Sequence, residues 1–330
     1  MRNFDRCIGG YAGCGNLGDD AILQGYLCGL DDNERRGVVV LSGHPRRDRR
    51  RFGVRCAGRK NPFAVMYYLL RSRRFLLGGG SLLQNGTGRL SLLYYLGLLR
   101  LARFCGCETE LLAAGIGPLR GERAIRSVVR ELKKCRFIQL RDANSALFLK
   151  KRGISPLKLS VVDDPALLLS APAPTRRFFL LREQGLDLFS LYYCVILRSP
   201  TPENDGCIPA IAEALRVLAA KTGAAMVFLP LDYDRDIAVT SRVFRYVGGR
   251  IVRPRDVSEA LALISGCRRL LSMRLHGLIL ARALCIPSLA VSPDSFEPKL
   301  ASFCLEHHIP HLSPSQTTVS SLVELMGAEL

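Results

Sequence analysis

Short apolar runs of strand length alternate with longer helical segments along almost the entire chain. We expect strands at residues 6–11, 37–41, 74–77, 110–114, 137–140, 158–162, 192–197, 225–229, 250–252, 269–272 and 288–291. We expect helices at residues 21–30, 62–72, 91–105, 122–134, 143–152, 207–221, 236–246, 256–265 and 276–284. Alternation of this kind is typical of parallel sheets covered by helices.

The pattern is interrupted once, near the middle. After Asp164 and Pro165 the composition shifts, and residues 171–175 (APAPT) resemble a linker. A chain of 330 residues also suggests about two domains. We therefore predict two Rossmann-like, doubly wound α/β domains, residues 1–171 and 172–330, that face each other across a cleft. Ligands are expected at the carboxyl ends of the strands.

The positive charge is concentrated in the first predicted domain. The whole chain carries 47 Lys and Arg against 29 Asp and Glu, a formal net charge of +18. Residues 1–170 hold 30 basic and 14 acidic side chains, a net +16, and the remainder holds 17 and 15, a net +2. Such a field implies an anionic partner: a nucleic acid, a phosphorylated substrate or an anionic membrane surface.

The 12 cysteines do not form a metal-binding pattern. No C-x-x-C occurs, and the C-x-C of Cys105 and Cys107 lies in an apolar stretch far from the histidines near the C-terminus. There is no secretory signal pattern at the first residue, so we predict reduced thiols in a cytoplasmic protein. No apolar run reaches the roughly 18 residues needed to cross a bilayer, and membrane contact is expected to be peripheral.

Two glycine-rich loops follow predicted strands. Residues 13–18 match G-x-G-x-x-G, which admits a dinucleotide site, a tight turn, or a turn that presents Asn16, Asp19 and Asp20 to the cleft. The expected acidic ribose partner after the second strand is absent. Residues 78–81 (GGGS) allow close approach to the backbone but are not a P-loop, since no Lys-Ser or Lys-Thr follows.

Two further motifs lie in the second predicted domain. Asp232, Tyr233 and Asp234 form a D-x-D, which we expect in a solvated loop. Residues 272–277 (SMRLHG) join a strand to a helix and place Arg274 and His276 at a helix start, where the dipole favours an anion. A histidine there can exchange protons near neutral pH, although a structural histidine is the alternative.

The motifs together resemble the polysaccharide pyruvyl transferases of the bacterial cell-wall (CsaB) type, over about residues 8–304. They stand in the family's order: 11–23 (YAGCGNLGDDAIL), 78–84 (GGGSLLQ), 115–119 (GIGPL), 141–145 (RDANS), 164–165 (DP) and 273–276 (MRLH). The resemblance implies a GT-B-like fold and transfer of a pyruvyl group from phosphoenolpyruvate to a sugar. In the best-known branch the acceptor is an N-acetylmannosamine unit of a lipid-linked cell-wall polysaccharide precursor, and the ketal helps to anchor S-layer proteins.

The family's functional positions fall on Asp19, Arg141, His276 and Lys299. Lys299 stands in residues 296–300 (FEPKL), a variant of the family's Tyr-Asp-Pro-Lys-Val. Two other departures are Asn85, where the family usually has Asp, and Ser272, where it usually has Gly. We take the Asn85 change to affect acceptor preference more than the reaction.

Phosphoenolpyruvate carries a carboxylate and a phosphate, which require fixed cations and N–H donors. We predict that Arg141, Arg274 and Lys299 bind it, that His276 is the acid that protonates the enol carbon, and that Asp19 orients or deprotonates the acceptor hydroxyl. Further substrate-binding positions are predicted in the two glycine loops: Asn16, Gly79, Gly80, Ser81 and Gln84. We expect neither a metal nor a cofactor besides phosphoenolpyruvate as co-substrate.

The remaining expectations concern partners. The basic run at residues 46–51 (RRDRRR) is a candidate patch for the inner face of the plasma membrane, with a solvated basic loop as the alternative. A GT-B glycosyltransferase that uses a nucleotide sugar is the alternative function. Nucleic-acid binding is not expected, because Trp is absent and Tyr and Phe do not interleave with the arginines.

Overall fold

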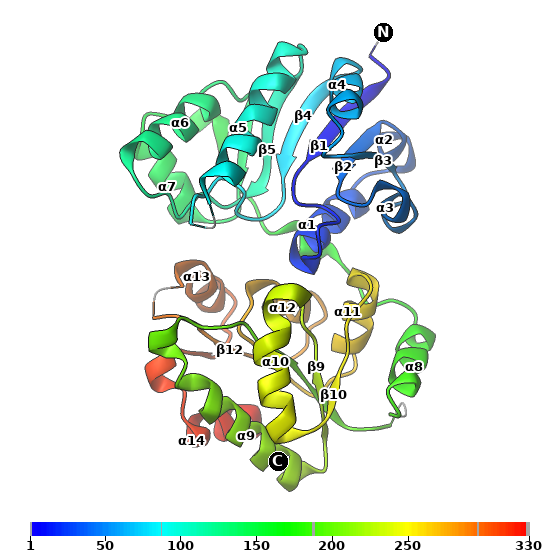
Figure 1. The fold of residues 1–330 in the computed structure, drawn as a ribbon, viewed down its shortest axis with the longest axis vertical. Coiled ribbons are helices and arrows are strands. Elements are labelled where there is room, and N and C mark those ends of the chain that lie inside the picture. The colour runs from blue at the N-terminus through cyan, green and yellow to red at the C-terminus, as the bar shows by residue number, and fades with distance from the viewer. Residues whose placement is uncertain (1, 87, 187–188, 296, 328–330) are drawn as a thin grey trace. The chain divides into compact units, whose positions relative to one another are not determined.

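The chain forms two compact units, Met1–Leu168 and Leu169–Leu330, each built on one parallel β-sheet (Figure 1). The computed structural model describes residues 2–86, 88–186, 189–295 and 297–327. The expected α/β class is confirmed, since strands and helices alternate in both units. All twelve cysteines lie in the described part, and all are free thiols there.

The first unit has a seven-stranded sheet in the order β3-β2-β1-β4-β5-β6-β7. Its strands are β1 (Phe4–Gly9), β2 (Val38–Ser42), β3 (Arg55–Gly58), β4 (Ser72–Gly78), β5 (Glu108–Ala114), β6 (Phe137–Leu140) and β7 (Leu159–Val161). Its α-helices are α1 (Leu17–Cys28), α2 (Asp32–Arg36), α3 (Pro45–Phe52), α4 (Pro62–Leu70), α5 (Arg89–Phe104), α6 (Glu122–Leu132) and α7 (Ala143–Lys151). Two 3₁₀ turns follow, η1 (Pro156–Lys158) and η2 (Pro165–Leu168).

The second unit has a six-stranded sheet in the order β10-β9-β8-β11-β12-β13. Its strands are β8 (Tyr192–Ile196), β9 (Ala225–Phe228), β10 (Arg250–Ile251), β11 (Leu270–Ser272), β12 (Ser288–Val291) and β13 (His311–Leu312). Its α-helices are α8 (Pro174–Glu183), α9 (Cys207–Thr222), α10 (Tyr233–Val247), α11 (Val257–Ile264), α12 (Leu275–Ala283), α13 (Pro298–Glu306) and α14 (Val319–Gly327). The 3₁₀ turns are η3 (Pro202–Asn204) and η4 (Pro314–Gln316).

Each sheet has one topological switch point, at which the strand order reverses. The strand order reverses between β1 and β4 in the first unit and between β8 and β11 in the second. At such a point the connections on either side leave toward opposite faces, so a crevice opens at the carboxyl ends of the strands. In both units the loops at this position carry the motifs identified in the sequence.

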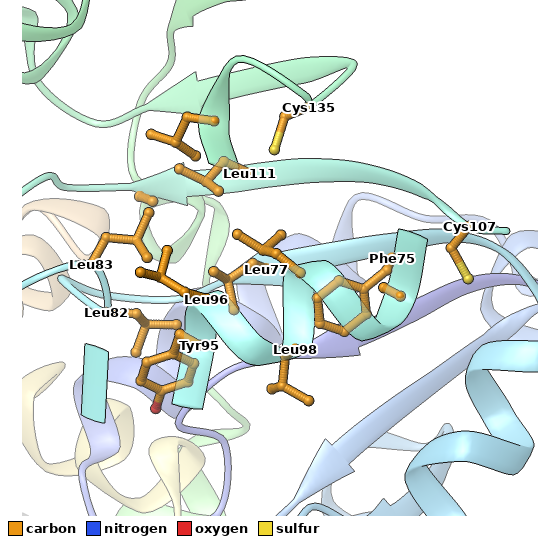
Figure 2. Packing of buried hydrophobic residues seen from close by; sticks show 14 of the residues in the cluster. Phe75, Leu77, Leu82, Leu83, Tyr95, Leu96, Leu98, Cys107, Leu111 and Cys135 are labelled. Carbon is orange, nitrogen blue, oxygen red and sulfur yellow. The ribbon is translucent and has the colours of Figure 1, made fainter. Parts of the chain in front are cut away.

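The core of the first unit explains why the carboxyl-terminal halves of its central strands are apolar. One face of the sheet packs against α5 through Leu96, Leu99 and Tyr95, all almost fully buried. Figure 2 shows Leu96 beside Leu77 of β4. The opposite face packs in a second cluster that holds side chains of α1. Strand segments buried on both faces need consecutive apolar residues, and β2 and the second halves of β4 and β5 have them.

Two boundaries differ from the sequence expectations for identifiable reasons. Helix α1 begins at Leu17 and not at residue 21, because the Asn16 side chain accepts a hydrogen bond from the Gly18 amide (3.0 Å) and caps the helix. The expected linker at 171–175 is only partly a linker, since Pro174 starts α8. Proline suits the first turn of a helix, where its missing N–H leaves no bond unmade.

The 3₁₀ turn η2, which includes Pro165, lies against the middle of α1. A Cβ added to Gly25 would lie 2.0 Å from the Pro165 carbonyl oxygen, so only glycine fits there. Replacing Gly25 with Ala should destabilise the protein by about 1–3 kcal/mol, because backbone has to move. The matched variant is Gly97→Ala on α5, where no atom lies within 4 Å and a gain of about 0.5–1 kcal/mol is expected. Urea unfolding of both variants checks this; equal effects would contradict it.

Candidate active site

The first loop and the start of α1 hold Asp19 at the switch point of the first sheet. Asp19 is 9% exposed and lies in the first turn of the helix, not in a loop as the sequence suggested. The Asn16 amide donates a hydrogen bond to Asp19 Oδ2 (2.7 Å). Asn16 thus caps the helix with its oxygen and orients the carboxylate with its nitrogen.

The triple-glycine loop after β4 passes directly beside that carboxylate. A Cβ on Gly80, whose φ is +64°, would lie 2.1 Å from Asp19 Oδ1, and one on Gly10 would lie 2.2 Å from the Gly78 oxygen. Gly79 is different: a Cβ there would have only the Asp19 carbonyl oxygen nearby, at 3.8 Å. At Gly80 the group that lies against the backbone is therefore the Asp19 side chain, and the close approach of a ligand to this loop stays a prediction.

A buried ionic network under the first loop was not anticipated from the sequence. Asp20 Oδ1 accepts a hydrogen bond from the Gly13 amide (2.7 Å), and its other oxygen lies 3.2 Å from Arg51 Nη2. Arg51 also contacts the fully buried Asp48 (3.2 Å). Burial raises the pKa of the Asp20 carboxyl, although the Gly13 amide and Arg51 act in the opposite direction.

The same network changes the interpretation of residues 46–51. They belong to helix α3, and Arg51, with 12% of its side chain exposed, faces inward together with Asp48. The alternative of a solvated basic loop is therefore wrong, and the membrane patch stays a prediction. Four arginines of this run remain exposed: Arg46, Arg47, Arg49 and Arg50.

Ser81 and Gln84 continue the triple-glycine loop, and both are half-buried. This loop pairs with the one after β5: the Gly115 amide donates to the Gly80 oxygen (3.2 Å) and the Gly117 amide to the Leu83 oxygen (3.0 Å). The Gly-Ile-Gly-Pro motif thus acts as a support for the glycine loop.

Asn85 forms two hydrogen bonds that the sequence did not predict, and its effect on acceptor preference stays a prediction. The Asn85 side-chain nitrogen donates a hydrogen bond to the Arg120 backbone oxygen (2.8 Å), and the side-chain oxygen accepts one from the Arg120 backbone amide (2.7 Å). An aspartate could not form the first of these bonds. Asn85 therefore ties the glycine loop to the segment after Pro118, which is a structural reason for the departure from the family pattern.

Arg141 lies at the carboxyl end of β6 and forms an ion pair with Asp164. Both side chains are nearly buried, at 9% and 5% exposure, and Asp164 also accepts a bond from the Ala166 amide (3.0 Å). The aspartate of the motif, Asp142, caps α7 by accepting from Ser145 N (2.7 Å). The Ser145 hydroxyl then accepts from the Ile116 amide (3.0 Å), which links this motif to the previous loop.

In the second unit, Arg274 and His276 lie at the switch point, between β11 and α12. Arg274 is the N-cap residue of α12, and His276 is half-buried in its first turn. The Ser272 hydroxyl accepts from the Arg274 amide (3.1 Å) and donates to the Arg274 oxygen (2.7 Å). Ser272 therefore stabilises the turn that presents both side chains, and this use accounts for a serine where the family usually has glycine.

Arg274 is held by a carboxylate that the sequence analysis did not identify. Asp236, which is fully buried, accepts two bonds from the Arg274 guanidinium, one of them from Nε (2.6 Å). Burial raises the pKa of Asp236, opposed by its bonds to Arg274. The nearby Asp232 Oδ2 lies 3.8 Å from Arg274 Nη2. The D-x-D motif is therefore not a solvated loop: Asp232 precedes α10, with 13% of its side chain exposed.

Lys299 lies in the first turn of α13, after β12, and is half-buried. The residue before Pro298, Glu297, forms an ion pair with Arg198 at the end of β8 (2.6 Å). Phe296, the first residue of the variant motif, lies outside the described residues. Arg198, Arg274, His276 and Lys299 thus follow β8, β11 and β12, which are adjacent in the sheet.

The candidate residues of each unit include cationic groups and backbone donors at helix starts, which are groups that bind anions in proteins. Within the described residues, no group of three or more His, Cys, Asp or Glu side chains is arranged to hold a metal ion. Nor does any described helix combine the length and apolarity needed to cross a bilayer.

The two parallel-sheet units define a GT-B-like protein, and solved structures share this fold. UDP-GlcNAc 2-epimerase from Methanocaldococcus jannaschii aligns over 98% of this chain and 92% of its own, at 12% identity and a TM-score of 0.65. The Neisseria meningitidis UDP-GlcNAc 2-epimerase bound to UDP-GlcNAc aligns over 97% of this chain and 90% of its own, at 12% identity and a TM-score of 0.62. Anabaena Alr3699/HepE in complex with UDP-glucose aligns over 98% of this chain and 89% of its own, at 10% identity and a TM-score of 0.62.

The family assignment comes from the sequence. The model of the polysaccharide pyruvyl transferase family matches residues 16–295, and the chain belongs to this family. No curated protein matches the chain significantly. Structural similarity at about one-tenth identity shows the fold alone, because one fold hosts many activities.

The double hydrogen bond of Asn85 yields a prediction about stability. Asn85→Asp should lower the free energy of unfolding by about 1 kcal/mol at neutral pH, because the donor to the Arg120 oxygen is lost and a carboxylate faces that oxygen. Asn33→Asp on the exposed surface of α2 is the matched control and should change little. Urea unfolding measures both; an unchanged Asn85→Asp protein would mean that these bonds contribute nothing.

Proposed function

We propose that the protein transfers the pyruvyl group of phosphoenolpyruvate to two hydroxyls of one sugar, forming a cyclic ketal and releasing phosphate. The observation that carries this proposal is the turn at β11–α12, where Arg274 and His276 begin a helix. The two strands beside β11 in the sheet, β8 and β12, are followed by two other basic residues, Arg198 and Lys299. Membership of the polysaccharide pyruvyl transferase family supports it.

The cations act on the donor. Arg141, Arg274 and Lys299 bind the carboxylate and the phosphate, and the α12 amino terminus adds backbone donors. The Arg274 guanidinium donates two of its five N–H groups to Asp236. Its orientation is therefore fixed before substrate binds. Because these side chains neutralise the donor charge, the proposed reaction needs no metal ion.

The bond changes follow from the donor chemistry. His276, as an imidazolium, protonates the methylene carbon of phosphoenolpyruvate, and the adjacent carbon becomes an oxocarbenium-like centre. One sugar hydroxyl attacks that carbon, while Asp19 orients it or accepts its proton. A second hydroxyl of the same sugar then forms the second C–O bond as the bond to phosphate breaks. One hydroxyl proton replaces the proton given up by His276, and the other leaves with phosphate.

The acceptor is assigned to the first unit. We propose that Asn16, Gly79, Gly80, Ser81 and Gln84 surround it, beside Asp19, and that it is an amino sugar linked through a diphosphate to a lipid. N-acetylmannosamine of a cell-wall polysaccharide precursor, as in the branch that anchors S-layer proteins, is the first acceptor to test. Such an acceptor places the enzyme at the cytoplasmic face of the plasma membrane.

The role of His276 is tested by phosphate release. With phosphoenolpyruvate and a panel of lipid-diphosphate amino sugars, the wild type should release phosphate only when an acceptor is present. His276→Ala should lower kcat by about 10²–10⁴-fold, the usual contribution of a general acid. His307→Ala, which alters a histidine beyond the carboxyl end of α13, is the control and should retain activity. Full activity of His276→Ala would exclude the histidine as the acid.

The contact between Gly80 and Asp19 is tested by a matched pair of glycine variants. Gly80→Ala should lower kcat/KM by about 10²-fold, because its Cβ displaces the Asp19 carboxylate. Gly79→Ala carries a similar backbone strain, with a φ of +89°, but has room for a Cβ, so its loss should be smaller. Circular dichroism confirms that both variants are folded. Equal losses would show that backbone strain, and not the position of Asp19, limits activity.

A further inference from the structure

Helices α4 and α5 expose large apolar side chains along one line each. On α4 these are Phe63, Tyr67 and Leu70, with 85%, 45% and 55% of the residue exposed. Their spacing of four and three residues places them on one face of the helix. On α5 they are Leu90, Leu93 and Phe104, exposed to 82%, 60% and 86%.

The two exposed lines form one surface of the first unit. Both helices pack on the same face of the sheet, since Val65 and Leu69 of α4 share a core cluster with Leu96 and Leu99 of α5. The helices also touch directly, as α4 contacts α5 and Met66 Sδ lies 3.4 Å from Cys105 Sγ. We call the outward side of α4 and α5, with the six apolar residues, the α4–α5 surface.

The charge on this part of the chain has a single sign. From residue 49 to residue 107 there are 12 Arg and Lys residues and not one Asp or Glu. Four of these basic side chains are exposed close to the ends of α4 and α5: Lys60, Arg71, Arg73 and Arg89. The guanidinium of Arg71 lies 4.4 Å from the centre of the Tyr67 ring, so cationic and apolar groups are intermixed.

We propose that the α4–α5 surface binds an anionic lipid bilayer, with its apolar side chains in the headgroup boundary and its basic side chains on the lipid phosphates. Exposed apolar residues surrounded by Lys and Arg are typical of segments that lie in the membrane interface. Each basic residue near an anionic leaflet contributes about 1 kcal/mol. A second copy of the chain is a poor occupant, because two copies of a surface without acidic residues repel each other.

The position of the surface relates it to the candidate site of the first unit. Helices α4 and α5 follow the carboxyl ends of β3 and β4, so Phe63, Leu90 and Leu93 lie toward the sheet edge that carries Asp19 and Gly80. Arg59, just before α4, donates a hydrogen bond to Cys14 Sγ in the first loop (3.0 Å). Bound to a membrane through this surface, the unit presents its acceptor loops close to the lipid, and this consequence rests on the proposed function.

Vesicle co-sedimentation tests the binding without any substrate. The wild-type protein should bind vesicles of equal parts phosphatidylcholine and phosphatidylglycerol, and bind phosphatidylcholine alone much more weakly. Phe63→Ser/Leu90→Ser/Leu93→Ser should lower the partition coefficient about tenfold or more. Leu157→Ser, which alters an apolar residue with 91% exposure elsewhere in the unit, should bind like the wild type.

A charge-matched pair separates this surface from the overall positive charge. Lys60→Glu/Arg71→Glu/Arg89→Glu should also lower binding at least tenfold, whereas Arg123→Glu/Arg126→Glu/Lys134→Glu on α6 and just after it should have a much smaller effect. Equal losses in the two triple variants would overturn the proposal in favour of binding by net charge. Unchanged vesicle binding of the serine variant would also overturn the proposal. The same holds if the wild type does not bind vesicles but forms dimers that the serine variant cannot form.

These assays contain neither phosphoenolpyruvate nor a sugar. A protein that binds vesicles but releases no phosphate would retain the α4–α5 surface and lose the proposed reaction. A protein that releases phosphate from phosphoenolpyruvate with a water-soluble acceptor, but does not bind vesicles, would show the reverse.

Discussion

A parallel sheet brings the carboxyl ends of all its strands to one edge, and the site depends on this constraint. At the switch point of the first sheet the loops after β1 and β4 meet so closely that Gly10 and Gly80 have no space for a side chain. The loop after β5 then bonds to the β4 loop, and the Arg-Asp-x-x-Ser segment bonds to the β5 loop through Ser145. The sequence motifs of the first unit thus form loops that are hydrogen-bonded to one another, and the loop after β4 lies against Asp19.

Three arginines among the candidate residues of the two units share a second feature: each forms an ion pair with a carboxylate. Arg141 pairs with Asp164, Arg274 with Asp236 and Arg198 with Glu297. A guanidinium paired in this way has lost much of its rotational freedom, so less entropy is lost when an anionic substrate binds. Asp236 is the strongest case, because it is fully buried and contacts Arg274 through both oxygens. The ion pairs therefore restrict the orientation of these guanidinium groups, which keep their positive charge.

The sequence predicted the fold and the location of the motifs well, and their internal contacts less well. Periodicity located most strands, but β3 and β13 were missed, since they are short and β3 is not continuously apolar. The glycines predicted the close approach of a ligand to the backbone and did not indicate that the Asp19 side chain lies against Gly80. Asp236 was missed because it is four residues from Asp232 inside a helix, and only the tertiary structure brings it to Arg274. Likewise, the basic run of α3 gave no sign that Arg51 points inward to Asp20 and Asp48.

The central claim is that the basic groups at the carboxyl ends of β8, β11 and β12 bind phosphoenolpyruvate as donor. Isothermal titration of the wild-type protein with phosphoenolpyruvate, and separately with UDP-N-acetylglucosamine, tests this claim most directly. The account predicts saturable binding of phosphoenolpyruvate that Arg274→Ala abolishes, and no binding of the nucleotide sugar. Tight binding of the nucleotide sugar with none of phosphoenolpyruvate would contradict the account and identify the protein as a user of nucleotide sugars.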